Sequence, residues 1–270
     1  MMDQTETFGA ESPPHQQSAL APPPDLSIVV PALDEQDNVQ PLVKELDEQL
    51  TGSGISWETI VVNDGSRDET GARLAELIPT NHRLRVITLS PHRGKSAAMA
   101  AGIGAARAPL IGFLDADLQN PPADLVAMAR RMLDEADFAL LQGWRRERCD
   151  SRPRRIASRV GFAARAWILG DRTEDAGCGL RVLRREFAIR LPLEFEGMHR
   201  FVAPLVGMLG GRVEEMPVGH RPRNSGQSKY GVGPLRRGCG GLLDLLAVRW
   251  MQWRHGHSGE PTATPGTRRS

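Results

Sequence analysis

The feature that most constrains the fold is a fourfold alternation of strand-like and helix-like segments in the first half of the chain. The strand-like runs lie within residues 25–35, 59–62, 84–90 and 108–122. After the first run, apolar residues from Val39 to Leu50 follow the three- and four-residue spacing of an amphipathic helix. Alternating strands and helices with short connections predict an α/β fold with a mostly parallel central sheet flanked by helices.

Polar and acidic residues stand where three of these predicted strands end. They occupy residues 31–35, 63–66 and 115–119. In open parallel sheets, ligands bind at the carboxyl ends of the strands. The sequence therefore predicts one ligand site at this edge, built from three separate segments.

The second half of the chain has a looser pattern. It contains a strand with a basic exit, FALLQGWRRER, a basic amphipathic helix over 153–170, a glycine-rich turn, a helix over 197–211 and a last strand, RVEEMPVGH. The expected domain organisation is a disordered tail at 1–24, a domain at 25–235, an amphipathic C-terminal helix at 236–255 and a disordered tail at 256–270.

The net charge of +1 conceals an asymmetry. Residues 1–140 hold 10 Lys+Arg against 21 Asp+Glu, whereas residues 141–270 hold 24 against 12. The basic half is expected to attract substrate phosphates or an anionic membrane. Its alternative interpretation is a set of solvated arginines.

Composition excludes several classes of protein. The chain has no run of eighteen apolar residues, so we expect no membrane-spanning helix. Its proline-rich start lacks the pattern of a signal peptide. Three widely spaced cysteines predict reduced thiols in a cytoplasmic protein. Aromatic residues make up only 5%, which argues against a nucleic-acid partner that binds by stacking.

Asp115 and Asp117 form an Asp-x-Asp pair directly after the fourth strand, and Gln119 follows at the next alternate position. Carboxylate and amide oxygens suit Mg²⁺ or Mn²⁺, with a diphosphate supplying further ligands. Such an ion would neutralise the charge that builds on a departing nucleoside diphosphate. A solvated loop or a helix cap would explain the same pair.

Two further acidic residues end strands. Asp64 could accept hydrogen bonds from a base or a ribose, or close an Asx-turn before Gly65. Glu35 could contact a nucleotide or cap the following helix.

Arg223 and Lys229 flank a Gly- and Ser-rich segment, NSGQS. A loop with a cation at each end could close over a diphosphate and open to release the product.

Six blocks, SIVVPALDE, VVNDGSRDET, GKSAAMAAGI, FLDADLQNPP, DAGCGLRVLRRE and HRPRNSGQSKYG, occur in the order seen in family 2 glycosyltransferases. Over residues 25–230 the chain resembles the dolichyl- or undecaprenyl-phosphate sugar transferase branch, which is dolichol-phosphate mannosyltransferase-like. The resemblance implies a GT-A fold, an inverting displacement and a divalent metal, Mg²⁺ or Mn²⁺.

The resemblance also implies roles for individual positions. The nucleotide-sugar would contact Pro31, Leu33, Glu35, Val62, Asp64, Asp115, Ala116, Asp117, Arg223 and Lys229. The metal would be held by Asp115, Asp117 and Gln119. The acceptor phosphate would be held by Arg145, Arg154 and Ser158. Asp117 and Arg145 are the expected catalytic residues, and Leu33 stands where the family often has an aromatic residue.

A lipid-phosphate acceptor agrees with the absence of an obvious general base. A sugar hydroxyl needs a base to remove its proton, whereas a phosphate is already anionic and needs cations to position it. His199 is expected to support the fold and not to act as a base. The alternatives are a transferase of the same fold that acts on a saccharide or another hydroxyl, and a non-catalytic nucleotide-sugar-binding module.

A membrane surface is the remaining expected partner. The helices at 153–170 and 242–253 combine arginines with apolar and aromatic residues, as helices in the headgroup layer do. The alternative is ordinary packing, with Trp250 and Trp253 covering the core. The expected location is the cytoplasm, peripheral on the inner face of the cytoplasmic membrane, in cell-envelope glycan biosynthesis.

Overall fold

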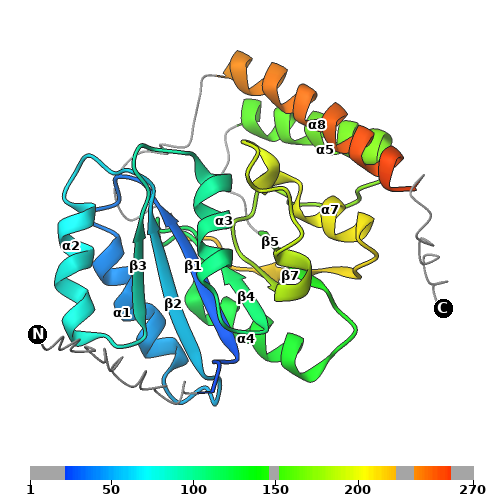
Figure 1. The fold of residues 1–270 in the computed structure, drawn as a ribbon. Helices are drawn as coiled ribbons and strands as arrows, with labels where there is room; N and C mark the ends of the chain where they lie inside the picture. Colours follow the sequence, from blue (N-terminus) through cyan, green and yellow to red (C-terminus); the bar gives the residue numbers. More distant parts are fainter. Residues whose placement is uncertain (1–21, 146–151, 223–233, 257–270) are drawn as a thin grey trace, which may run out of the picture.

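The computed structural model describes residues 22–145, 152–222 and 234–256. Its centre is a seven-stranded sheet in the order β3-β2-β1-β4-β6-β5-β7, covered by helices on both faces (Figure 1). The predicted α/β class and mostly parallel sheet are confirmed.

The first half of the chain builds one side of the sheet from parallel strands. These are β1 (Leu26–Ala32), β2 (Trp57–Asn63), β3 (Leu84–Thr88) and β4 (Leu110–Phe113). The helices that follow them are α1 (Val39–Leu50), α2 (Thr70–Leu77), α3 (Lys95–Ala105) and α4 (Pro122–Asp134). A short 3₁₀ turn, η1 (Ile78–Thr80), precedes β3.

The other side of the sheet is mixed. Its strands are β5 (Leu140–Arg145), β6 (Arg181–Arg184) and β7 (Val213–Val218). β6 lies between β4 and β5 and runs antiparallel to both, while β5 and β7 pair in parallel. Because β6 is inserted this way, the glycine-rich turn that leads into it arrives next to the carboxyl end of β4.

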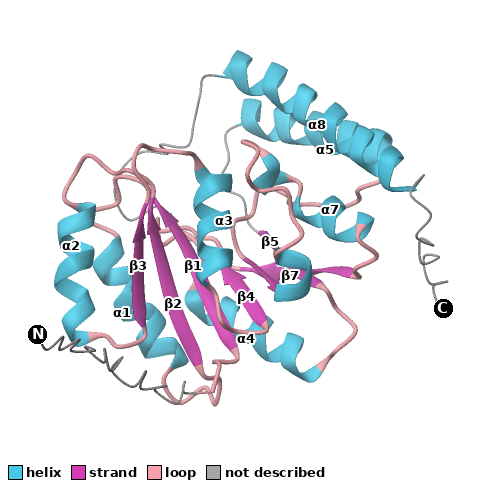
Figure 2. Ribbon diagram, viewed as in Figure 1, coloured by secondary structure: helices cyan, strands magenta, loops and turns pink. Residues whose placement is uncertain are grey.

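Strand burial explains the two layers of helices. Every residue of β1 and β2 is buried, and alternate side chains belong to separate cores on the two faces. Helices α1, α2 and α4 cover one face of the sheet, and α3 and α7 (Val202–Met208) cover the other (Figure 2). Their buried apolar side chains belong to the two separate cores. The helical spacing predicted for α1 is confirmed, since the residues that define it, Val39, Leu42, Val43, Leu46 and Leu50, are all buried.

The small residues of α3 allow this helix to lie close against β1. A Cβ on Gly102 would lie 2.2 Å from Cγ1 of Val29, so only glycine fits without a shift. Close packing of α3 brings its first turn to the carboxyl edge of the sheet, where β1, β2 and β4 also end.

The segment predicted as one helix over 197–211 is instead divided. A 3₁₀ turn, η2 (Met198–Arg200), precedes α7, and α6 (Arg185–Ala188) forms a single turn after β6. Gly197 has a positive φ of 87°, a conformation outside the helical range, so a regular helix begins only after this point.

The two longest helices, α5 (Arg152–Leu169) and α8 (Pro234–Gly256), lie side by side over α7 (Figure 1). On α8, Leu245 and Val248 are buried against the domain. The alternative in which Trp250 and Trp253 cover the core is wrong, because these side chains are 60% and 52% exposed. None of the helices in the described part of the chain has both the length and the apolar character that crossing a membrane requires.

Candidate active site at the carboxyl ends of the strands

The loops after β1 and β2 are bound to each other. The backbone N–H of Asp34 donates to Ser66 Oγ (2.9 Å), and that of Glu35 donates to Thr70 Oγ1 (2.8 Å). In return, Arg67 N–H donates to Asp34 Oδ1 (2.7 Å). Asp34 has a positive φ of 50°, which is uncommon for an L-residue, although aspartate adopts it more often than most. These crossed bonds fix the first two segments of the predicted nucleotide site as one unit.

The structure places the predicted nucleotide contacts of these segments together. Pro31 of β1 is the register partner of Val62 of β2, and both are buried. Leu33 and Glu35 are partly exposed in the loop that follows. Glu35 Oε2 accepts a hydrogen bond from Asn38 Nδ2 (2.5 Å), so this side chain also supports the entry to α1.

Asp64 is completely buried and holds the segment that enters α3. Its carboxylate accepts hydrogen bonds from the backbone N–H groups of Arg93 (2.8 Å) and Gly94 (3.0 Å). His92 Nδ1 lies 2.8 Å from the same carboxylate. Asp64 therefore orients α3 toward the strand ends, a role that neither interpretation of its sequence motif included.

Asp115 follows β4 and lies among residues of α3, β6, η2 and the turn before β6. Lys95, the first residue of α3, contacts its Oδ1 atom. Gly179, in the turn before β6, lies so close that a Cβ there would be 2.3 Å from Oδ2. Arg181 of β6 and His199 of η2 line the same small pocket.

These neighbours decide the ionisation of the cluster. Burial opposes the charge of Asp115, but Lys95, together with Arg181 and His199, holds the pKa of this carboxyl below its usual range. Burial and the positive charges of Lys95, Arg200 and Arg181 push the pKa of His199 well below its usual value. Asp115 is thus anionic and His199 neutral near pH 7.

His199 is held by the neighbouring helix. Its Nδ1 atom lies 2.8 Å from Ser96 Oγ, and its backbone N–H donates to the same hydroxyl (3.1 Å). Its carbonyl accepts from Arg181 Nη1 (3.0 Å). These bonds agree with the predicted supporting role.

The turn after β4 carries the second carboxylate. Asp117 is 6% exposed, its neighbour Ala116 is buried, and its Oδ1 accepts the backbone N–H of Gln119 (3.1 Å). Leu118 adopts a positive φ of 62°, which is rare for a branched residue and marks a turn held under strain. Asp34 and Leu118 are the only non-glycine residues with positive φ in the described part of the chain, and both lie at this edge of the sheet.

Gln119 connects this turn to the segment that precedes the predicted closing loop. Its carbonyl accepts from Arg221 N–H (2.7 Å), and its Nε2 donates to the Arg221 carbonyl (3.4 Å). Arg223 and Lys229 lie outside the described residues. Arg221, two residues before Arg223 in the sequence, is bound to the residue that follows the Asp-x-Asp turn.

The residues at this turn fit a hard divalent cation. Asp115 and Asp117 supply two carboxylates from one turn, and carboxylate oxygens are ligands that Mg²⁺ and Mn²⁺ accept. Lys95 shows that the position beside Asp115 attracts a cation. Across residues 22–145, 152–222 and 234–256, no group of three or more His, Cys, Asp and Glu side chains is arranged to hold a metal.

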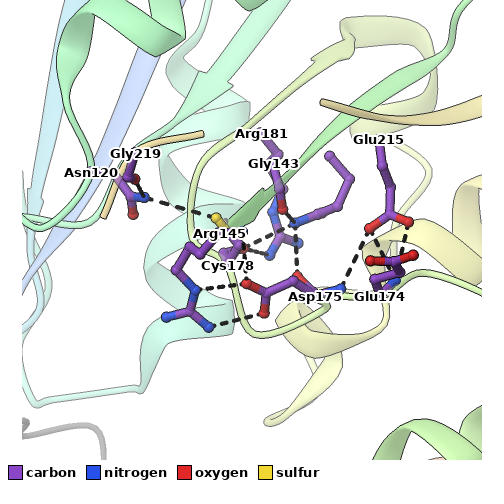
Figure 3. A network of polar contacts seen from close by, with 10 residues as sticks. Asn120, Gly143, Arg145, Glu174, Asp175, Cys178, Arg181, Glu215 and Gly219 are labelled. Atoms are coloured by element: carbon purple, nitrogen blue, oxygen red, sulfur yellow. Dashed lines mark hydrogen bonds and ion pairs between the residues drawn. The ribbon is translucent and has the colours of Figure 1, made fainter. Parts of the chain in front are cut away.

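Arg145, at the end of β5, is fixed by a buried carboxylate (Figure 3). Its Nε and Nη2 donate to the two oxygens of Asp175, at 2.7 and 2.9 Å, and its backbone N–H donates to Oδ2 (3.2 Å). The Arg145 side chain is 20% exposed and that of Asp175 only 3%. A bidentate pair of this kind sets the plane of the guanidinium.

The segment that carries Asp175 is fixed by further hydrogen bonds. Glu215 of β7 accepts the backbone N–H groups of Glu174 (3.0 Å) and Asp175 (3.4 Å), and Gln142 Nε2 donates to the Asp175 carbonyl (3.4 Å). Cys178, in the same network, is a buried free thiol whose pKa burial raises to about 11. The network joins β5, the glycine-rich turn and β7 around Arg145 (Figure 3).

The remaining predicted acceptor residues, Arg154 and Ser158, belong to the first turns of α5. Their side chains lie outside the described part of the structure. α5 begins seven residues after Arg145, so both positions follow the strand end that carries this arginine.

Sequence reasoning missed four residues of the site: Lys95, Asp175, Gly179 and Arg181. Each belongs to a recognised block, GKSAAMAAGI or DAGCGLRVLRRE, to which no role had been given. The insertion of β6 between β4 and β5 brings Gly179 and Arg181 to Asp115, whereas Lys95 reaches the same carboxylate from the first turn of α3.

Comparisons with known proteins agree with this geometry. Residues 27–191 match the family described as Glycosyl transferase family 2. The chain is 37% identical over 228 residues to the dodecaprenyl-phosphate galacturonate synthase of Rhizobium johnstonii, which covers 83% of this chain and 66% of that protein. It is 32% identical over 210 residues to the undecaprenyl-phosphate 4-deoxy-4-formamido-L-arabinose transferase of Edwardsiella ictaluri, covering 77% of this chain and 63% of that protein. The chain thus spans somewhat less than two thirds of the length of these relatives.

Among solved structures, glucosyl-3-phosphoglycerate synthase from Mycobacterium tuberculosis, in complex with Mn²⁺, uridine diphosphate and phosphoglyceric acid, has a similar fold. The TM-score is 0.61 at 18% sequence identity, covering 85% of this chain and 78% of that one. At this identity the likeness shows a shared fold, in agreement with the GT-A fold that the motifs imply.

Proposed function

Because the chain belongs to glycosyl transferase family 2, we propose that it transfers a sugar from a UDP- or GDP-linked donor to a polyprenyl phosphate of the undecaprenyl or dolichyl type. The observation that carries the proposal is the sequence match to two relatives that are both named for polyprenyl-phosphate products or acceptors. The family match also contains the Asp-x-Asp turn and Arg145.

The donor would bind across the ends of β1, β2 and β4. The crossed loops after β1 and β2 would receive the nucleoside, and Asp115 and Asp117 would hold Mg²⁺ or Mn²⁺. When bound, the ion supplies charge neutralisation to the departing diphosphate. The remaining ligands would come from the diphosphate and from water.

The acceptor would approach from the side of β5. Arg145, oriented by Asp175, would hold the lipid phosphate so that one of its oxygens faces the anomeric carbon of the sugar. The bond from this oxygen to the anomeric carbon forms as the bond to the diphosphate oxygen breaks, and the configuration inverts. The acceptor oxygen is already anionic, so no proton has to be removed.

His199 does not serve as a base in this scheme. Its pKa is low enough for a neutral ring, but its Nδ1 atom faces Ser96 and its backbone anchors Arg181. Through these contacts His199 stabilises Ser96 and Arg181, and Arg181 lines the same pocket as Asp115.

We place the membrane contact of this transferase on α5 and α8. On α8, Leu242, Leu246, Trp250 and Trp253 follow helical spacing and are 51–60% exposed. On α5, Trp167 is 87% exposed. Arg249 and Arg254 are exposed on the same helix as the α8 stripe. Apolar and aromatic side chains flanked by arginines match an anionic headgroup layer. The inner face of the cytoplasmic membrane remains the predicted location.

The proposal is tested by product analysis. The protein is incubated with a panel of UDP- and GDP-sugars, undecaprenyl phosphate and Mn²⁺, and the lipid fraction is extracted and identified by mass spectrometry. We expect one donor to yield a lipid-linked monosaccharide, and chelation of the metal to abolish it. Parallel reactions with saccharide acceptors test the hydroxyl alternative, and product from those reactions alone would contradict the proposal.

A further inference from the structure

Lys95 occupies an unexpected position for a residue outside the predicted site. It is the first residue of α3, its side chain is only 17% exposed, and its ammonium contacts Asp115 Oδ1. Asp115 is one of the two carboxylates that fit the divalent ion. A lysine on this oxygen competes directly with a metal for the same ligand atom.

The surroundings of Asp115 leave it little freedom to turn away from Lys95. Its other oxygen, Oδ2, lies against Gly179, where a Cβ would be 2.3 Å away. Arg181 lines the same pocket and is only 5% exposed. Its guanidinium donates to the carbonyls of Cys178 (2.7 Å) and His199 (3.0 Å). Lys95 is therefore the neighbour that has to move if a cation binds at Oδ1.

The balance of charge in this cluster sets what can enter. In the pocket that holds Asp115, this carboxylate contributes one negative charge, and Lys95 and Arg181 contribute two positive ones. A bare divalent ion meets a site that is already neutralised. A metal bound to a nucleoside diphosphate brings its own negative charge, which offers the ammonium of Lys95 a new partner.

Lysine is suited to such an exchange. Its ammonium is a compact charge on a flexible four-carbon stem, so it can change partners without movement of the backbone. The backbone at the start of α3 is in turn fixed by Asp64, through the N–H groups of Arg93 and Gly94.

We propose that Lys95 is the counter-ion of Asp115 in the metal-free protein and transfers its ammonium to the diphosphate when metal and nucleotide enter together. The divalent ion consequently binds well only with the nucleotide. This inference rests on the proposed function, since it takes the ligand to be a metal-bound nucleoside diphosphate.

The test measures two affinities on the same variants. Binding of Mn²⁺ alone is followed by electron paramagnetic resonance, and binding of UDP or GDP in the presence of Mn²⁺ by calorimetry. Lys95→Met should bind Mn²⁺ alone about 10-fold more tightly, because the competing cation is gone, and bind the Mn²⁺–nucleotide about 10-fold more weakly, because a charge-assisted contact is lost. A role in folding alone does not predict opposite signs.

Two variants serve as controls. Lys95→Arg keeps the positive charge and should stay close to the wild type in both measurements. Lys44→Met removes the same charge from an exposed site on α1, where Lys44 is 77% exposed and paired only with Glu48 among the ion pairs found in the described residues. It should change neither affinity. Lys95→Gln replaces Lys95→Met if circular dichroism shows that the latter is unfolded.

The outcomes distinguish a failure of the proposed function from a failure of the role of Lys95. If the wild type binds neither UDP nor GDP with Mn²⁺, the proposed function fails and this inference fails with it. If the wild type binds a nucleotide but Lys95→Met binds Mn²⁺ alone no more tightly, or shifts both affinities in the same direction, only the role of Lys95 is overturned.

Discussion

The two sides of the sheet, one around β1, β2 and β4 and the other around β5 and β7, are built in different ways. Around β1, β2 and β4, parallel buried strands end in acidic turns, and the loops after β1 and β2 are bound to each other by side-chain to backbone hydrogen bonds. Around β5 and β7, a mixed sheet supports one fixed arginine and two long helices that expose aromatic and aliphatic side chains. The first region holds charge in a rigid arrangement, and the second presents an apolar and basic surface.

This difference follows the chemistry that we propose for each region. A nucleotide-sugar is a small, highly charged ligand, and fixed groups at strand ends bind it without reorganisation. A polyprenyl phosphate is a long apolar chain with a charged end, which requires one oriented cation and access to lipid. The variants below separate the two regions, starting with the largest expected effect.

Asp117→Asn tests the donor side most severely. The loss of one carboxylate should reduce metal-dependent nucleotide binding and turnover by roughly 1,000-fold, since the metal stabilises the leaving diphosphate by several kcal/mol. Calorimetry with Mn²⁺ and UDP or GDP measures the binding. Asp134→Asn, at the exposed far end of α4, is the matched control. Unchanged affinity and turnover would remove Asp117 from the metal site.

Gly179→Ala tests whether the turn before β6 positions the carboxylate of Asp115. The added Cβ would meet Asp115 Oδ2, so this carboxylate has to shift, and a displacement near 1 Å costs about 100-fold in turnover. Gly104→Ala in α3, where nothing lies within 4 Å of the new Cβ, should stabilise the protein by about 0.5–1 kcal/mol and leave turnover unchanged. Equal activity of the two variants would show that the contact of Gly179 with Asp115 is unimportant.

Arg145→Ala tests the acceptor side alone. The KM for undecaprenyl phosphate should rise about 10- to 100-fold, the value of a charge-assisted hydrogen bond, with little change in the KM for the donor. Asp175→Asn should produce part of the same effect, because the guanidinium loses its bidentate partner. On the Arg145→Ala background, Asp175→Asn should add nothing to the acceptor KM. Equal shifts in the two KM values would contradict an acceptor role.

Trp250→Ser should have the smallest effect, confined to lipid binding. Since Trp250 is 60% exposed, the unfolding free energy should change by less than about 0.5 kcal/mol. Flotation with vesicles that contain anionic lipid should show binding weakened about 3- to 10-fold, in proportion to the apolar area removed. Wild-type binding should also weaken with added salt. A wild type that stays with the unbound fraction at low salt would rule out the membrane surface.

Much of the first region could be predicted from the sequence. The runs before Pro31 and Asn63, which are rich in β-branched residues, and the apolar run before Asp115 are buried strands, and the apolar spacing of α1 matches its buried face. These are local properties, because periodicity and strand-ending residues reflect the chain's immediate neighbours. The grouping of the acidic turns followed from parallel pairing alone.

The second region could be predicted less well. A helix at α8 was expected from composition, yet exposure of Trp250 and Trp253 depends on whether another element packs against that face. The roles of Lys95 and Asp175 were also hidden. Each side chain meets its partner across 20 or more residues of sequence, and no local pattern encodes such a contact.

By itself, the sequence determined the alternation of strands and helices, the acidic turns at three strand ends and the basic character of the second half. Only the tertiary structure decided that β6 enters antiparallel between β4 and β5. This placement brings Gly179 and Arg181 to Asp115, and Asp175 to Arg145. The physical reason is that strand pairing is set by burial and hydrogen bonding over the whole sheet, whereas each segment of sequence specifies only its own periodicity.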